Sequence, residues 1–126
     1  MQSELDQCPH VKNVGFKSGK ELEMLIRKAR CSVYPSIWYE NCPFSVMESI
    51  SYGTPVIGAD IGGIPELVED GKTGFLFEPG NSSDFAEKIK RLLTDDKLAA
   101  EMSENGLKKD FTSVSQYCEK LLEIYK

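Results

Sequence analysis

Residues 31–59 read CSVYPSIWYENCPFSVMESISYGTPVIGA, and this stretch decides the fold. It opens with a short β-prone run that Pro35 ends, and after a loop the pattern predicts a helix over about Pro43–Tyr52. Proline suits the first turn of a helix, Gly53 suits its end, and Pro55 prevents its continuation. The closing run, PVIGA, is apolar throughout, as in strands that are buried on both faces. A strand, a helix and a buried strand in this order predict a βαβ unit with parallel strands.

The rest of the chain continues this alternation of short apolar runs and helical patterns. A weak strand at Val11–Phe16 precedes a helix, at whose start Ser18 and Glu21 have the spacing of a capping box. Downstream, the pattern predicts a short helix at IPELVED (64–70), a strand at GFLFE (74–78), a helix capped by PGNSSD (79–84), and two more helices at about 96–109 and 114–125. The resulting order, βαβαβαβααα, predicts an α/β domain, with a Rossmann-like parallel sheet, flanking helices and right-handed crossovers.

Length and charge fit one globular domain. The chain has 126 residues, of which 40% are hydrophobic and 28% charged, and 15 Lys and Arg against 20 Asp and Glu give a net charge of −5. This composition excludes wholesale disorder. The acidic balance argues against nucleic acid and anionic membranes as partners. No apolar run approaches the ~18 residues of a membrane span, and the amino terminus has no signal-peptide core, so we expect a cytoplasmic protein without a transmembrane segment.

Several familiar catalytic motifs fail on spacing. The GKT of Gly71–Thr73 resembles the end of a P-loop, but Glu66 occupies the position of the earlier glycine, and the segment reads as a turn between a helix and a strand. The glycines of residues 58–63 do not make the dinucleotide fingerprint, and no serine has the nucleophile-elbow pattern. The single histidine, His10, lies in a polar terminal stretch. We expect free thiols and no metal site, because no C-x2-C pair occurs among Cys8, Cys31, Cys42 and Cys118.

The loop before the helix at Pro43 follows a strand, and ligands of open α/β sheets bind at the carboxyl ends of strands. The first helical amides, near Phe44 and Ser45, lack intrahelical acceptors and lie at the positive end of the helix dipole, which makes an anion site. Glu48 follows on the same face, where it could accept hydrogen bonds from a diol such as ribose. Glu40, on the other side of the same anion, could hold sugar hydroxyls. The alternative is that Glu48 is a solvated helix residue and Glu40 a loop charge.

Further motifs occur in a recognisable order. They are VGFKSGKEL near the start, PS at 35–36, E-x7-E from Glu40 to Glu48, GTPVI at 53–57, GGIPE at 62–66, DGKTGFLF at 70–77 and the tail FTSVSQYCEKLLEIY. Together, over about residues 11–126, they resemble the carboxyl-terminal donor domain of retaining glycosyltransferases with the GT-B fold, specifically the large family four.

The resemblance implies an enzyme that transfers a hexose from a UDP- or GDP-linked sugar to a saccharide or lipid-linked acceptor, with retention of configuration and without a cofactor or an obligatory metal. It implies that Glu40 is the catalytic residue, with a mainly electrostatic and positional role, and that Glu48 holds the ribose. The residues that it implies for the donor sugar and phosphate are Glu40, Asn41, Cys42, Pro43, Phe44 and Ser45, and those for the base are Phe16, Lys17 and Ser18. Gly62 and Gly63 have two interpretations, a tight turn before the next helix or a close backbone approach to substrate.

The resemblance also implies that this is an incomplete carboxyl-terminal half of a GT-B fold. We expect a single partial donor-binding domain over 1–126, with about 1–10 poorly structured and a terminal helix at 113–126 that crosses to the other domain. We expect the N-terminal acceptor domain and an upstream Arg/Lys pair to be missing from this chain. We therefore expect no turnover from this chain alone, and a full-length enzyme peripheral to the membrane. Two other interpretations are a free-standing, non-catalytic nucleotide or nucleotide-sugar binding module, and a flavodoxin-like signalling domain, which would need acidic residues clustered at a first strand end.

Overall fold

The computed structural model describes residues 7–39, 43–109 and 114–124, and its centre is a parallel sheet. The sheet has three strands in the order β1-β2-β3. Their bounds are Ser32–Tyr34, Val56–Ala59 and Gly74–Phe77. Val56 pairs with Ser32 on one side and with Gly74 on the other, so the strands begin level and their carboxyl ends meet at one edge. The α/β class and the parallel sheet predicted from the sequence are confirmed.

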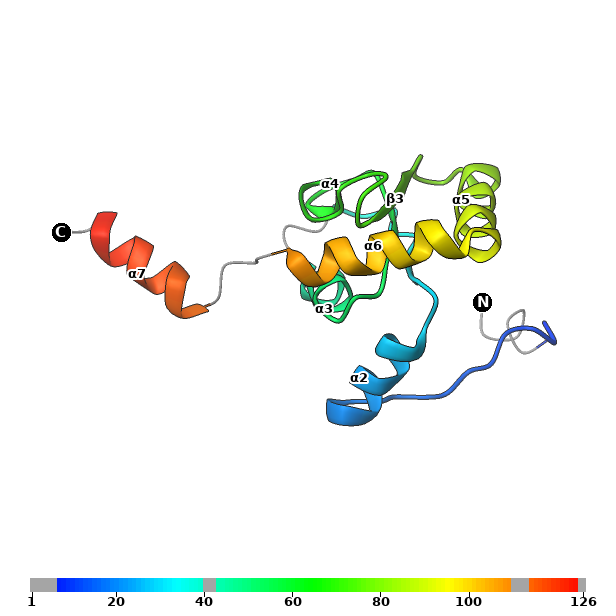
Figure 1. Ribbon diagram of the computed structural model, residues 1–126, viewed down its shortest axis with the longest axis horizontal. Helices are drawn as coiled ribbons and strands as arrows, with labels where there is room; N and C mark the ends of the chain where they lie inside the picture. The colour runs from blue at the N-terminus through cyan, green and yellow to red at the C-terminus, as the bar shows by residue number, and fades with distance from the viewer. Residues whose placement is uncertain (1–6, 40–42, 110–113, 125–126) are drawn as a thin grey trace.

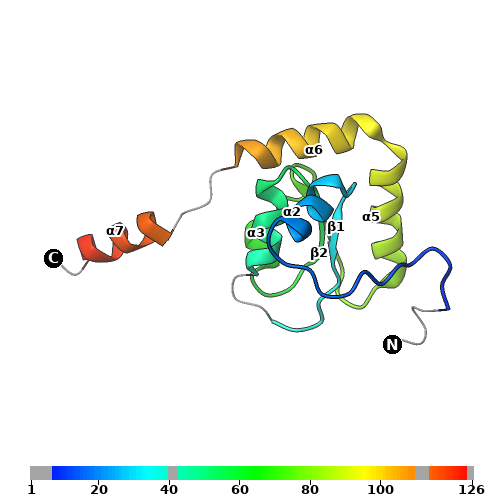
Figure 2. The ribbon, with the colours of Figure 1, turned by 90° about the horizontal axis from the view of Figure 1, so that it is seen from below.

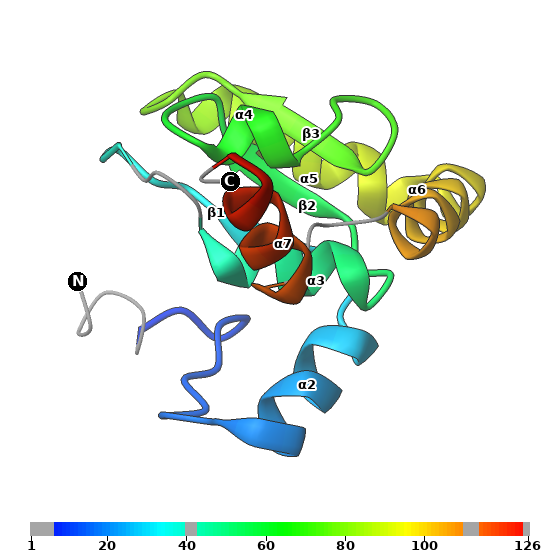
Figure 3. The ribbon, with the colours of Figure 1, turned by 90° about the vertical axis from the view of Figure 1, so that its left-hand side faces the viewer.

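Helices cover both faces of this sheet (Figures 1 and 3). The helices are α2 (Gly19–Lys28), α3 (Phe44–Ser51), α4 (Ile64–Leu67), α5 (Ser82–Thr94), α6 (Asp96–Lys108) and α7 (Val114–Ile124). The helices α3 and α4 pack on one face and α5 on the other, while α6 runs along the edge where the strands begin, from α5 to α3 (Figure 2). Across the part of the chain that the structure describes, no helix is long and apolar enough to cross a bilayer.

The core consists of two clusters that share β2. Ile57 and Ala59 face α5 and α6, where they pack with Phe75, Phe77, Leu92, Ala99 and Met102. Val56 belongs to the opposite cluster, with Val46, Ile50, Ile64 and Val68. Side chains of a strand alternate between its faces, so one strand supplies both clusters. All four residues of β2 are buried, which confirms the prediction of a strand covered on both sides.

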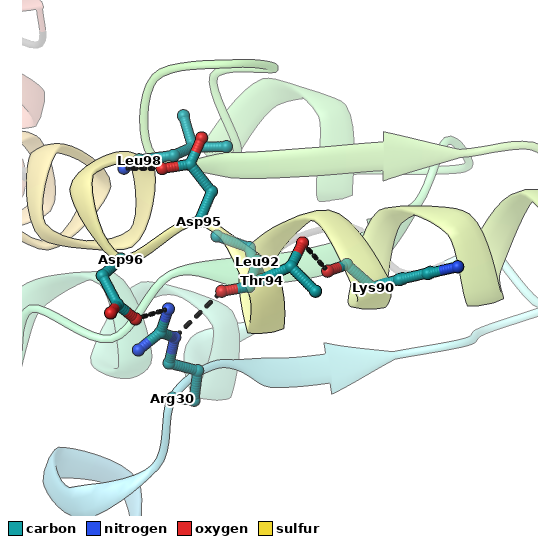
Figure 4. Close-up of polar contacts among 7 residues, drawn as sticks. All are labelled: Arg30, Lys90, Leu92, Thr94, Asp95, Asp96 and Leu98. Carbon is teal, nitrogen blue, oxygen red and sulfur yellow. Dashed lines mark hydrogen bonds and ion pairs between the residues drawn. The ribbon is translucent and has the colours of Figure 1, made fainter.

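Arg30 ties the start of β1 to the junction of α5 and α6 (Figure 4). Its Nε donates to the carbonyl of Leu92 at 2.9 Å, and its Nη2 lies 2.6 Å from an exposed carboxylate oxygen of Asp96. The carbonyls of the last turn of a helix have no intrahelical donor, so Arg30 satisfies one of them in α5. Asp95 separates the two helices and caps α6, because its Oδ1 accepts from the amide of Leu98 at 3.0 Å.

Two predictions for the amino-terminal part are wrong. Val11–Phe16 forms no strand, so the sheet has one strand fewer than expected over the described residues. A strand is stable only when a neighbour accepts its backbone hydrogen bonds, and no described strand lies beside this segment. Ser18 is the N-cap of α2, but its side chain makes no capping hydrogen bond, so the capping box is absent.

The helix predicted at residues 64–70 is shorter than expected, because α4 ends at Leu67 and Val68 is already extended. The chain turns there into β3, and the amide of Glu69 donates to the hydroxyl of Thr73 at 2.9 Å. The amide of Gly71 donates to the carbonyl of Gly74 at 2.8 Å, which closes the turn. The interpretation of EDGKTG as a turn, not a P-loop, is confirmed.

The contact between α6 and α3 requires a glycine. An added Cβ at Gly106 would lie 2.8 Å from the carbonyl oxygen of Ile50, a distance that a carbon and a backbone oxygen do not reach without a shift of one helix. Gly106 is buried in α6 and Ile50 is buried in α3, so neither helix can yield by moving a flexible side chain. The glycine therefore sets how closely α6 supports α3.

We expect Gly106→Ala to destabilise the chain, although glycine to alanine inside an exposed helix normally stabilises by about 1 kcal/mol. The forced separation of α6 from α3 opposes that gain, because overpacking typically costs about 1–3 kcal/mol. We expect this cost to exceed the gain in helix propensity. The measurement is the free energy of unfolding in urea. The matched control is Ala100→Gly at an exposed position of α6, which should lower stability through helix propensity alone. A more stable Gly106→Ala variant would contradict the contact.

Candidate functional site

The first turn of α3 lies at the edge of the sheet where the strands end. Pro43 is the N-cap of α3, and the amides of Val46 and Met47 donate to its carbonyl at 3.1 and 3.4 Å. The amides of Phe44 and Ser45 belong to the first turn, so no carbonyl of the helix can accept from them. The predicted helix start at Pro43 is confirmed, and this end of α3 carries the positive end of the helix dipole.

The loop that leads to α3 is described in part. Its first residues expose large side chains, since Trp38 and Tyr39 are 75% and 85% accessible. Glu40, Asn41 and Cys42, which the family resemblance implies for the donor sugar and phosphate, lie outside the described residues. Their roles stay predictions.

Glu48 faces a cleft between α3 and α2. The cleft has a volume of about 340 Å³, and Glu48 and Tyr52 of α3 line it. The opposite wall consists of Gly19, Lys20, Leu22, Glu23 and Ile26. Glu48 is exposed, but it is exposed toward this cleft, one turn after the amides of Phe44 and Ser45. The cleft therefore contains the predicted diol-binding carboxylate, whereas Phe44 and Ser45 do not line it, and their joint role in donor binding stays a prediction.

Sequence reasoning missed the α2 wall of this cleft. Glu23 pairs with Arg27 at 2.7 Å, and the guanidinium of Arg27 lies 4.4 Å from the centre of the Tyr52 ring. This chain of contacts joins the last turn of α2 to the end of α3. The signal in the sequence was the helical spacing of Lys20, Glu23 and Arg27, which places them along one face.

The predicted base-binding residues lie just before α2. The side chain of Phe16 is 92% exposed, and Ser18 is the N-cap of α2. Lys17 lines a separate hollow with Glu21, Met24, Leu25 and Lys28. Their side chains do not share the cleft of Glu48 in this structure, and their contact with a base stays a prediction.

Tyr34 connects the end of β1 with the first turn of α3. Its hydroxyl donates to the carbonyl oxygen of Ser45 at 3.0 Å. Burial raises the pKa of Tyr34, and the negative charge of Glu48 adds to this, while hydrogen bonding opposes it. The phenol is therefore a protonated donor at neutral pH.

Gly62 and Gly63 form the turn between β2 and α4. Gly62 has a φ of +60°, a conformation that favours glycine, and Gly63 is the buried N-cap of α4. The amide of Ile64 donates to the carbonyl of Ile61 at 3.3 Å. The turn therefore favours glycine at position 62 on its own account, whereas Gly63, with a φ of −82°, has an ordinary helical backbone. The approach of either glycine to a substrate stays a prediction.

Comparison of the sequence with protein families matches residues 2–109 to the model of glycosyl transferases group 1. An uncharacterised glycosyltransferase of Methanocaldococcus jannaschii is 35% identical over 97 residues, which are 77% of this chain and 27% of that protein. The sulfoquinovosyl transferase of Arabidopsis thaliana is 39% identical over 84 residues, 64% of this chain and 16% of the plant enzyme. The chain thus spans about a quarter or less of these curated relatives.

Solved structures agree with the sequence relatives. Sucrose-phosphate synthase from Thermosynechococcus elongatus superposes with a TM-score of 0.85 and 26% identity, over 98% of this chain and 31% of that one. Anabaena HepE, in complex with UDP and glucose, superposes with a TM-score of 0.83 and 27% identity, over 97% of this chain and 34% of HepE. The sheet and its helices are thus part of the GT-B glycosyltransferase fold. The match over residues 2–109 shows that the chain belongs to the glycosyl transferases group 1 family.

Proposed function

We propose that this chain is the donor-binding part of a retaining hexosyltransferase and binds a UDP- or GDP-linked hexose. The observation that carries the proposal is the position of Glu48, which faces the cleft between α2 and α3 one turn after the free amides of Phe44 and Ser45. Among the structural neighbours, Anabaena HepE was solved with UDP, with UDP and glucose, and with UDP-glucose. These complexes make UDP the first nucleotide to test.

The proposal assigns a group of the chain to the diphosphate, to the ribose and to the sugar of the donor. A diphosphate at the start of α3 receives hydrogen bonds from the first-turn amides and the favourable field of the dipole. A carboxylate only accepts hydrogen bonds, so Glu48 suits the two hydroxyls of ribose. The diphosphate gains negative charge as the sugar leaves, and donors already in place stabilise that charge most in the transition state. Glu40 acts beside the sugar as the electrostatic and positioning carboxylate.

We infer that the working enzyme has an N-terminal acceptor domain besides this donor-binding part. The outer edge of β1 supports this, because β1 pairs only with β2 among the described strands and Val33 on β1 is 44% exposed. No residue of α2 is buried, and Leu22 and Leu25 of its apolar face are among the exposed large side chains. An open strand edge beside uncovered apolar side chains is a surface that soluble proteins normally cover. In this proposal, the helix α7 crosses to the N-terminal domain. The acceptor is a saccharide or a lipid-linked sugar. The enzyme works in the cytoplasm, peripheral to the membrane.

Glu48→Gln should weaken UDP binding by ~1–3 kcal/mol, because the amide that replaces the carboxylate loses a charge-assisted acceptor for the ribose hydroxyls. Isothermal titration calorimetry of the 126-residue chain with UDP measures this. The control is Glu104→Gln, which makes the same charge change on the exposed side of α6 and should leave the affinity unchanged. Equal UDP affinities for wild type and Glu48→Gln would make Glu48 a solvated helix residue.

The chain alone should release no UDP from UDP-glucose above the blank, with or without a saccharide acceptor, because in this proposal a separate N-terminal domain holds the acceptor. A coupled assay for free UDP measures this at high protein concentration. UDP binding without turnover fits the donor-binding part of a longer enzyme and also the alternative, a free-standing nucleotide-sugar binding module. Turnover that Glu40→Ala abolishes would contradict both and make the chain a complete catalyst.

A further inference from the structure

The hydroxyl of Tyr34 closes the base of the loop that leads to α3. Tyr34 is the last residue of β1, and Ser45 is the second residue of α3. The hydrogen bond from the Tyr34 hydroxyl to the Ser45 carbonyl spans 3.0 Å. The two ends of the loop are therefore joined directly, whatever the residues between them do.

The core holds the ring of Tyr34 in place beneath this bond. The ring is half-buried against the cluster of Val46, Ile50, Val56, Ile64 and Val68. The backbone of Tyr34 is fixed by its pairing with Gly58 on β2. Because the ring and the backbone of Tyr34 are both held, its hydroxyl holds the carbonyl of Ser45, and with it the first turn of α3, in a fixed position.

The second half of α3 has anchors of its own. The buried hydroxyl of Ser49 donates to the hydroxyl oxygen of Ser32 at 2.7 Å, and the carbonyl oxygen of Thr54 lies 3.3 Å from it. The hydroxyl of Thr54 in turn donates to the carbonyl of Ile26 in α2 at 2.7 Å. These bonds join α3 to β1 and to the opposite wall of the cleft. Loss of the Tyr34 hydroxyl therefore affects the first turn and leaves the end that carries Tyr52 anchored.

We propose that Tyr34 is a positioning residue for the phosphate of the nucleotide sugar, because its bond to Ser45 holds the first-turn amides of α3 at the end of β1. The inference rests on the proposed function, in which those amides bind the diphosphate. Tyr34 does not touch the ligand in this scheme. It acts through the backbone of α3, so its contribution is confined to ligands that carry a phosphate.

Tyr34→Phe tests this, because it keeps the buried ring and removes only the hydroxyl. We expect the Kd for UDP to rise about 2- to 10-fold, the loss of one neutral hydrogen bond. The Kd for uridine, which has no phosphate, should stay the same. Both are measured by NMR titration of the full 126-residue chain.

The matched control is Thr73→Val, which also removes one hydroxyl from a hydrogen bond, the one that accepts from the amide of Glu69 at 2.9 Å. Thr73 is 2% exposed, immediately precedes β3 and does not line the cleft of Glu48. It should lower stability without changing either Kd. A second measurement needs no variant: in the wild type, UDP but not uridine should shift the 13Cζ resonance of Tyr34.

The outcomes separate the inference from the proposed function. An unchanged UDP affinity in Tyr34→Phe, or an equal loss for UDP and uridine, would overturn the positioning role while wild-type binding of UDP stands. A 13Cζ resonance that UDP leaves unmoved would overturn it too, even if the variant did not fold. A wild-type chain that binds no UDP at millimolar concentration would overturn the proposed function and the inference with it.

Discussion

The burial of β2 on both faces is the constraint on which the rest of the structure depends. Val56 and Ile57 are adjacent in the chain, yet each is fully buried in a different cluster. Burial of a side chain of this size contributes about 1.5–3 kcal/mol. Both contributions are realised only if helices cover both faces, so α3 and α4 pack on one side while α5 packs on the other, with α6 completing that second cluster.

The helix α3 carries this constraint to the candidate site. Its inner face is buried through Val46 and Ile50, and α6 supports it at Gly106. A helix fixed along one face presents its other face in a defined direction, and here that face carries Glu48 toward α2. The site is thus built on a helix whose inner face is buried in the core, and its loop is attached to a rigid support.

The amino-terminal part contrasts with α3, because its apolar side chains are not buried. The helix α2 has a strongly apolar side, yet none of its residues is buried, and its contacts with the body come from its last turns and from Arg30 just beyond them. The segment before it has strand-forming residues but no strand beside it. Apolar pattern alone does not produce packing, because the free energy comes from the surface that another element covers.

The sequence by itself determined the parallel α/β fold, the bounds of α3 and β2, and the neighbourhood of Ser45 and Glu48, because prolines, glycines and apolar periodicity act over short distances. It also determined the family, through motifs in a fixed order. Only the tertiary structure decided that Val11–Phe16 pairs with no described strand, that Lys20 and Glu23 of α2 line the same cleft as Glu48, and that the hydroxyl of Tyr34 donates to the carbonyl of Ser45. Those features depend on contacts between segments that the fold brings together. No local sequence pattern encodes which backbone carbonyl a distant hydroxyl will reach.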